Sequence, residues 1–208
     1  MRCAALQILM GLALVAAKTH AEPQPARQPT DVIAQMIERA EPGAEIRIPA
    51  GIYEGALAIR KPIVLDGSDS AIFDGLGQGT VIQVLADHVT IRHCAIRASG
   101  EDVTSEPSAI RVVAANAVIE SNRISDALFG IDLRESPGAV IRNNTITCKD
   151  LEAGRRGDGI RLWWSHGCTV EGNTNMAGSR EGDGVYQKAL DLQPDVLVGF
   201  VRHEAVGG

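Results

Sequence analysis

The chain has 208 residues, of which 45% are hydrophobic and 3% aromatic, with 22 glycines. Small aliphatic side chains must therefore fill its core, and they suit thin stacked β layers better than an aromatic-rich sandwich or a helical bundle. Twenty Lys and Arg against 26 Asp and Glu give a net charge of −6, which disfavours nucleic acid as a partner. Beyond the first 21 residues the chain has three cysteines, Cys94, Cys148 and Cys168, which are too few and too widely spaced for a disulfide framework or a CxxC-type zinc site.

Residues 1–21 have the pattern of a secretory signal peptide. One basic residue, Arg2, precedes an apolar run over 3–17, and small residues near the end resemble a cleavage site. The run is shorter than the ~20 residues of a membrane span, and a Pro-rich linker over 22–29 follows, so a retained anchor is the weaker alternative. The sequence predicts export without a transmembrane anchor. After cleavage the net charge is −8, because 18 basic and 26 acidic residues then remain.

A short amphipathic helix is expected directly after the linker. Thr30 or Asp31 would cap its start and Gly43 would end it. Four apolar residues at helical spacing form its buried face: Val32, Ile33, Met36 and Ile37. We interpret this helix as a cap on the fold that follows.

From Glu45 onward alternating strands replace helical spacing, and four segments form an internal repeat. An aliphatic pair two residues apart recurs at Ile82 and Val84, Ile110 and Val112, Ile131 and Leu133, and Ile160 and Leu162. A second set recurs further along each segment, at Val89 and Ile91, Ala117 and Ile119, Ala139 and Ile141, and Cys168 and Val170. One such segment cannot close a core alone, whereas stacked copies bury a continuous one. The sequence therefore predicts an all-β fold, a β-solenoid with a short N-terminal capping helix.

Two columns of charged residues support this stacking. The first contains Arg92, Glu120, Arg142 and Glu171. The second contains Gln83, Arg111, Asp132 and Arg161. Opposite charges would alternate at about 4.8 Å per turn of the solenoid. We assign both columns to pairing between exposed strands rather than to catalysis.

One turn position of the repeat carries a ladder of polar residues. Its members are Cys94, Asn122, Asn144 and Asn173. Asn tolerates the left-handed backbone conformation and can hydrogen-bond to its copy one turn away. The ladder is thus predicted to be structural.

Two polar, charged segments interrupt the repeat, at residues 100–107 and 148–157. Gly or Pro bounds each of them, so we interpret them as loops that leave the solenoid between turns. Such inserts are where binding functions concentrate on repeat scaffolds.

Several segments resemble the NosD family. The opening "PGAEIRIPAGIYEGALAIRKPIVLDG" and "AIFDGLGQGTVIQV" are typical of many β-helices, whereas "GIDLRESPGAVIRNNTI" and "RRGDGIRLWWSHGCTVEGN" resemble NosD more specifically. The resemblance implies a single-stranded right-handed parallel β-helix. It also implies a periplasmic accessory protein that works with an ABC-type ATPase and permease to assemble the copper centres of nitrous oxide reductase. Copper is expected as a cofactor from this resemblance alone, because the sequence contains no compact motif of copper ligands.

The resemblance covers residues 30–180, the N-terminal half of a NosD-like domain. Residues 181–208 lack the Asn position and the alternating strands, and Asn175 stands where an inward aliphatic residue is expected. This non-repeat tail is either a natural cap or the result of a frameshift or truncation, and we favour the second because an uncapped solenoid end promotes aggregation.

Copper would require His, Cys or Met ligands on a rigid surface. The candidates are His88, His93, Cys94, Cys148, His166, Cys168, Met176 and His203. Cys168 aligns with core positions and Cys94 with the ladder, and one disulfide plus an odd thiol is an alternative. The weak candidates His88, His93 and His166 do not share a site, since His166 would lie roughly 14 Å from His88 by strand spacing. No metal site is predicted.

A polyuronate lyase or hydrolase is a second hypothesis, because such enzymes use clustered carboxylates. The available ones are Asp66, Asp74, Asp132, Asp158 and Asp183. Four precede Gly, which is typical of turns, and Asp132 has Arg neighbours in its column. No catalytic residue is assigned, and a passive secreted scaffold is a third hypothesis.

The best candidate contact surface surrounds Trp163. Alternation along its strand directs Leu162 and Trp164 inward and Trp163 outward. We place Trp163 beside the second insert, near Arg155, Arg156 and Asp158, where Trp and Arg would favour a partner. The alternative is that the insert covers this tryptophan.

Overall fold

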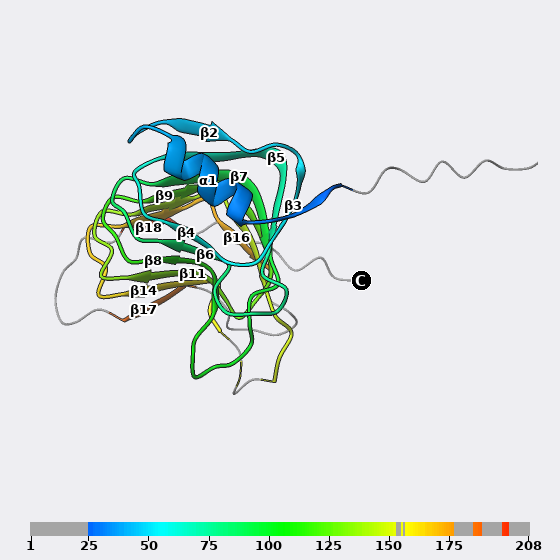
Figure 1. Ribbon diagram of the computed structural model, residues 1–208. Helices are drawn as coiled ribbons and strands as arrows, with labels where there is room; N and C mark the ends of the chain where they lie inside the picture. Colours follow the sequence, from blue (N-terminus) through cyan, green and yellow to red (C-terminus); the bar gives the residue numbers. More distant parts are fainter. Residues whose placement is uncertain (1–24, 153–154, 156, 177–184, 189–196, 200–208) are drawn as a thin grey trace, which may run out of the picture.

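In the computed structural model the chain winds as a parallel β-solenoid (Figure 1). The structure describes residues 25–152, 155, 157–176, 185–188 and 197–199, so the predicted signal peptide lies outside it. Two sheets form the walls. The large sheet contains β1 (Arg27–Pro29), β2 (Glu45–Arg47), β3 (Gly51–Glu54), β5 (Val64–Asp74), β7 (Thr90–Arg97), β9 (Val118–Glu120), β10 (Arg123–Ala127), β12 (Val140–Arg142), β13 (Thr145–Cys148), β15 (Thr169–Glu171), β16 (Thr174–Met176) and β18 (Leu197–Gly199). The second sheet contains β4 (Leu57–Ile59), β6 (Ile82–Val84), β8 (Ser108–Val112), β11 (Phe129–Arg134), β14 (Ile160–Trp163) and β17 (Val185–Lys188).

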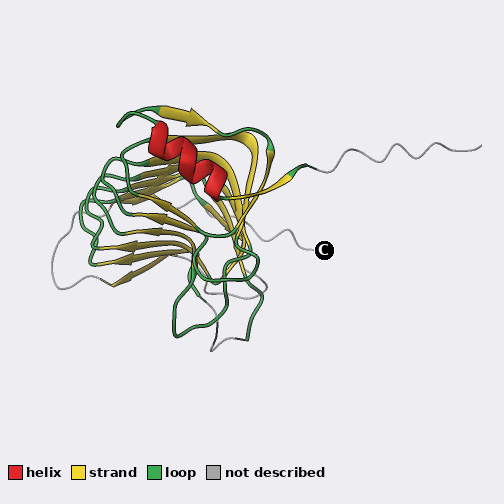
Figure 2. Cartoon of the chain, viewed as in Figure 1, coloured by secondary structure: helices red, strands yellow, loops and turns green. Residues whose placement is uncertain are grey.

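The capping helix α1 (Asp31–Arg39) packs against β4 at the start of the second sheet (Figure 2). Ile33 and Ile37 are buried on its inner face, whereas Val32, predicted on the same face, is exposed because it lies at the edge of the apolar stripe. Thr30 precedes the helix, but its hydroxyl donates to the Ala56 carbonyl instead of capping the helix. Among the described residues no helix is long and apolar enough to cross a membrane.

The predicted linker over 22–29 is too long by three residues. Arg27–Pro29 forms β1 and pairs with β3. The first strand of the large sheet therefore precedes the helix in the chain.

The register of the strands confirms the predicted columns. Ile110 pairs with Ile82 on one side and with Ile131 on the other, and Ile131 pairs with Ile160. In the large sheet Ile119 lies between Ile91 and Ile141. These aliphatic side chains are all buried in one continuous core.

The asparagine ladder is confirmed, with one difference in backbone conformation. Asn144 Oδ1 accepts hydrogen bonds from both the backbone N–H and Nδ2 of Asn122, each at 3.0 Å. Asn173 Oδ1 accepts the same two bonds from Asn144, at 2.9 Å. The left-handed conformation belongs to the residue before each ladder position, for example Ser121 and Asn143, both at φ +55°. The asparagine side chain is thereby turned along the solenoid axis.

Two described strands beyond residue 180 pair in register with the solenoid, where the sequence predicts a tail without such strands. In β17, Val185 pairs with Ile160 of the second sheet, and in β18, Leu197 pairs with Thr169 of the large sheet. Strand pairing needs backbone hydrogen bonds in register, which the chain can make without an asparagine at the turn. The side chain of Asn175 lies outside the described part.

Both inserts leave the solenoid at the same corner, between the large and the second sheet, and their described residues lie below the strands in Figure 1. The second insert returns at Gly157, where a Cβ atom would lie 2.1 Å from the Leu128 carbonyl oxygen. Only glycine fits this close approach. Both inserts thus end against the start of β11.

Candidate binding face on the second sheet

The outer face of the second sheet carries a buried cluster of charges. Gln83, Arg111, Asp132 and Arg161 lie side by side on β6, β8, β11 and β14, as predicted. Their environment was predicted wrongly, however, because Asp132 is 0% and Arg161 3% exposed. These residues are therefore not ordinary surface ion pairs.

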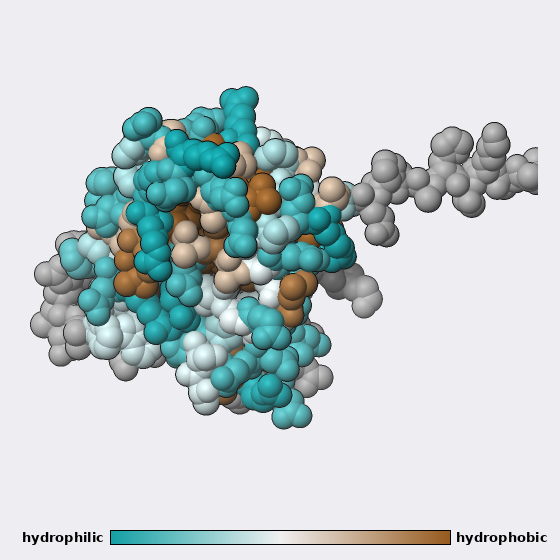
Figure 3. Space-filling model, viewed as in Figure 1, coloured by the Kyte–Doolittle hydropathy of each residue, from teal (hydrophilic) through white to brown (hydrophobic). Residues whose placement is uncertain are grey.

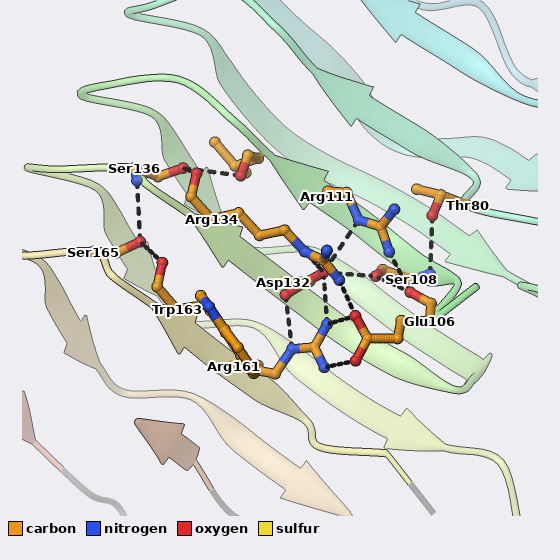
Figure 4. Close-up of polar contacts among 11 residues, drawn as sticks. Thr80, Glu106, Ser108, Arg111, Asp132, Arg134, Ser136, Arg161, Trp163 and Ser165 are labelled. Atoms are coloured by element: carbon orange, nitrogen blue, oxygen red, sulfur yellow. Dashed lines mark hydrogen bonds and ion pairs between the residues drawn. The ribbon is translucent and has the colours of Figure 1, made fainter. Parts of the chain in front are cut away.

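Asp132 is the centre of the cluster (Figure 4). Its Oδ2 accepts hydrogen bonds from Nε of Arg111 at 3.1 Å, Nε of Arg134 at 2.9 Å and Nη2 of Arg161 at 3.0 Å. Its Oδ1 accepts a further bond from Nε of Arg161 at 2.8 Å. Three guanidinium groups from three successive strands thus converge on one carboxylate.

A second carboxylate, from Glu106, reaches the cluster from the first insert. Its Oε1 and Oε2 lie 3.0 and 3.3 Å from Nη1 and Nη2 of Arg161, in a bidentate pair. Glu106 also pairs with Arg134, and its carbonyl oxygen accepts a hydrogen bond from Arg111. With three arginines and two carboxylates, the cluster has a net charge of +1 on an acidic protein.

Aromatic rings cover this cluster. The guanidinium carbon of Arg161 lies 3.9 Å from the centroid of the Phe129 ring and 5.6 Å from that of Trp163. Trp163 contacts Trp164 edge-to-face at 5.2 Å between centroids. The cation beside Trp163 is therefore Arg161, on the same strand.

Trp164 was predicted to point into the core, and this is wrong. It is 41% exposed, and its backbone is left-handed at φ +49°. The turn after β14 is fixed by Ser165, whose hydroxyl donates to the Trp163 carbonyl and accepts from the Ser136 backbone N–H at 3.0 Å. Trp164 is an additional residue in this turn, which breaks the alternation.

The structure describes three of the four predicted contact residues. Trp163 faces outward and is half-buried at the end of β14, where it pairs in register with Arg134. Arg155 is exposed on the insert and Asp158 is half-buried, with its carbonyl accepting a hydrogen bond from Gly130. Arg156 lies outside the described residues. Sequence reasoning missed Glu106 and Phe129, whose roles depend on how the inserts close.

The arginines set the ionisation of both carboxylates. Burial alone would raise the pKa of Asp132, but hydrogen bonds and charge from Arg161 and Arg134 outweigh it and hold the pKa below its ordinary value. The same balance of burial against Arg161 and Arg134 lowers the pKa of Glu106. Both groups are ionised at neutral pH.

Stability is expected to depend on pH through these groups. Because both pKa values are lowered in the folded state, their stabilisation is present above the ordinary values of 3.8 and 4.5 and is lost as the pH falls through the folded-state values. We expect the difference in unfolding free energy between the wild type and Glu106→Gln to be constant above about pH 5 and to shrink in more acidic solution. Urea unfolding followed by circular dichroism across this range measures it. A difference that stays constant into acid would contradict this assignment.

The three described histidines do not form a metal site with their neighbours, and the candidate His203 lies outside the described residues. His88 and His166 are exposed in turns, and the turns of Asn116 and Gly138 separate them along the solenoid. His93 Nδ1 lies 3.4 Å from Asp66 Oδ1. Within the described ranges no three His, Cys, Asp or Glu side chains could hold one metal ion, so the residues present do not fit copper.

The three cysteines in the described part of the chain are Cys94, Cys148 and Cys168, which are buried and form no disulfide with one another. The single disulfide considered above is therefore not formed. Burial raises the pKa of the Cys94 thiol to about 12, so this ladder cysteine is a protonated packing residue at neutral pH.

The candidate carboxylates of the enzyme hypothesis have structural partners. Asp66 accepts a hydrogen bond from the Ser68 backbone N–H and pairs with Arg92. Asp74 accepts from the Leu76 N–H and pairs with Arg97. These turn roles follow the prediction from the Asp-Gly pattern. Asp183 lies outside the described residues.

Comparison with known proteins supports the fold. The family model of the right-handed β-helix region matches residues 80–189, more than half of the chain. A protein of Pseudomonas aeruginosa named "Probable ABC transporter binding protein NosD" is 32% identical over 147 residues, which are 69% of this chain and 34% of that protein. Its namesake from Stutzerimonas stutzeri is 31% identical over 142 residues, 65% of this chain and 32% of that protein. The chain thus spans about a third of the length of these relatives.

Proposed function

This chain belongs to the right-handed β-helix family and is NosD-like, and from that premise we propose that it is a periplasmic accessory protein of an ABC transporter. In this role it takes part in assembling the copper centres of nitrous oxide reductase. It acts as a binding scaffold, not as a catalyst. Copper is the cargo of such a system, and the described residues offer no group of His, Cys, Asp or Glu side chains that could hold it.

The observation that carries this proposal is the outer face of the second sheet. Trp163 and Trp164 lie beside an arginine cluster that three successive strands hold in place. Trp and Arg dominate binding energy at protein interfaces when they sit on a rigid support. A scaffold needs such a surface, and the β-helix supplies it.

Co-purification tests the proposal. The tagged chain is co-expressed with the transporter permease and ATPase encoded in its own genome, and retention of both subunits is measured. We expect the wild type to retain them and Trp163→Ala to lose at least about tenfold, because truncating an interface hot spot costs about 2 kcal/mol. Arg142→Gln, on the large sheet, is the matched control. Equal retention by wild type and Trp163→Ala, or retention by neither, would reject the proposal.

A further inference from the structure

Glu106 differs from the other members of the arginine cluster in its place in the fold. Asp132 and the three arginines all belong to neighbouring strands of the second sheet, whereas Glu106 comes from the first insert. If its carboxylate left, three guanidinium groups would face Asp132 alone, an excess of two positive charges. The cluster therefore requires a second carboxylate, but the sheet does not supply it.

The backbone and surroundings of Glu106 favour exchange. Its φ of +51° is a left-handed conformation, which costs a residue with a side chain roughly 1–2 kcal/mol. The preceding insert residues 101–105 are exposed. The Glu106 side chain is itself 35% exposed, against 0% for Asp132. The carboxylate of Glu106 is thus on a partly exposed side chain outside the strands, while the carbonyl oxygen of this residue stays bonded to Arg111 and Ser108 of β8.

We propose that Arg111, Arg134 and Arg161 form a carboxylate-binding site that Glu106 fills in the free protein and a Glu or Asp side chain of an acidic partner segment fills in the complex. This inference rests on the proposed docking role of the same face. The present occupant is a glutamate on an exposed loop, so the site has the shape that a polypeptide carboxylate requires.

The neighbouring residues suit such a segment. Trp163 and Trp164 offer aromatic surface directly beside the guanidinium groups. The positive excess is local, because the chain as a whole carries −6. An acidic segment would be repelled by most of the molecule and held here. In Figure 3 apolar residues gather over the strands below α1, whereas the described residues of the lobe below them are largely hydrophilic.

Intrinsic fluorescence tests the proposal directly, because the two tryptophans of the chain are Trp163 and Trp164. The probe is a short peptide of alternating Glu and Gly, and the control peptide has Gln in place of Glu. We expect the Glu peptide to change the emission saturably. Glu106→Gln should bind it about tenfold more tightly because the internal competitor is gone, and Arg134→Gln should lose the response.

Matched controls make the result decisive. Arg142→Gln removes a similarly exposed arginine from the large sheet and should bind like the wild type. Unchanged affinity in Glu106→Gln, an equal response to the Gln peptide, or an equal loss in Arg142→Gln would overturn the proposal. A response to polygalacturonate without one to the Glu peptide would overturn it in favour of a glycan. Circular dichroism confirms that each variant is folded.

The two proposals can fail separately. Peptide binding that follows this pattern, without co-purification of the transporter, would reject the proposed function and leave the carboxylate site standing. If Arg134→Gln instead retained the transporter subunits as well as the wild type does, the proposed function would stand and the carboxylate site would be rejected.

Discussion

Replacing Asp132 with Asn is expected to lower the free energy of unfolding by about 3–5 kcal/mol, the usual cost of removing one partner from a buried ion pair. Asn has nearly the same shape, so packing is retained and the charge is lost. Its amide hydrogens would also face the N–H groups of Arg111, Arg134 and Arg161. Glu106 would then be the single carboxylate opposing three cations.

Urea unfolding at neutral pH, followed by circular dichroism, measures this loss. Glu120→Gln is the matched control, because Glu120 pairs with Arg142 in the first charge column, where Arg142 is 44% exposed. Exposed pairs contribute about 1 kcal/mol or less, so this variant should stay close to the wild type. Comparable losses in the two variants, or a loss below about 1 kcal/mol for Asp132→Asn, would show that the cluster is not an electrostatically distinct site.

The ion cluster contributes more to positioning the first insert than to the free energy of folding. The desolvation penalty of buried charges is nearly as large as the free energy gained from their attraction. Apolar residues of equal volume therefore often stabilise a protein as well or better. What apolar residues could not do is bind the carboxylate of Glu106 and so fix the end of the first insert above β11 and β14. The cluster thus links the solenoid to the first insert, whose path the repeat does not specify.

The repeat explains why so much of the fold was predictable. Strands in a solenoid stack in register, so a residue such as Ile119 can be aligned with its neighbours from sequence spacing alone. The pairing of Arg142 with Glu120 and the hydrogen bonds of Asn122 and Asn144 follow from that alignment. Each of these contacts depends on two residues one turn apart, and the spacing fixes both.

The candidate site was less predictable because it departs from the repeat at two places. Glu106 belongs to an insert, whose path no periodicity determines. Trp164 occupies a turn with one additional residue: Val112 precedes the next inward position, Ala117, by five residues, whereas Leu162 precedes Cys168 by six. That difference was visible in the sequence, and it indicates the bulge that turns Trp164 outward.

Replacing Asn144 with Ala is expected to destabilise the protein by about 2–4 kcal/mol, because each buried polar group left without a partner costs about 1–3 kcal/mol. The backbone N–H of Asn122 would lose its acceptor, and the Ile119 carbonyl would lose the donor Nδ2 of Asn144, now at 2.8 Å. Both groups are buried between turns, where water cannot replace the side chain without opening the stack.

Asn143→Gly is the control for this substitution, since Asn143 is exposed and its left-handed backbone suits glycine. We expect it to change stability by less than about 0.5 kcal/mol. Amide hydrogen exchange adds a local readout, because the Asn122 N–H should lose protection in Asn144→Ala before the rest of the sheet does. Uniform loss of protection across all strands would instead mean that the ladder acts through the whole core, and unchanged protection at Asn122 would show that the asparagine side chains do not hold the turns together.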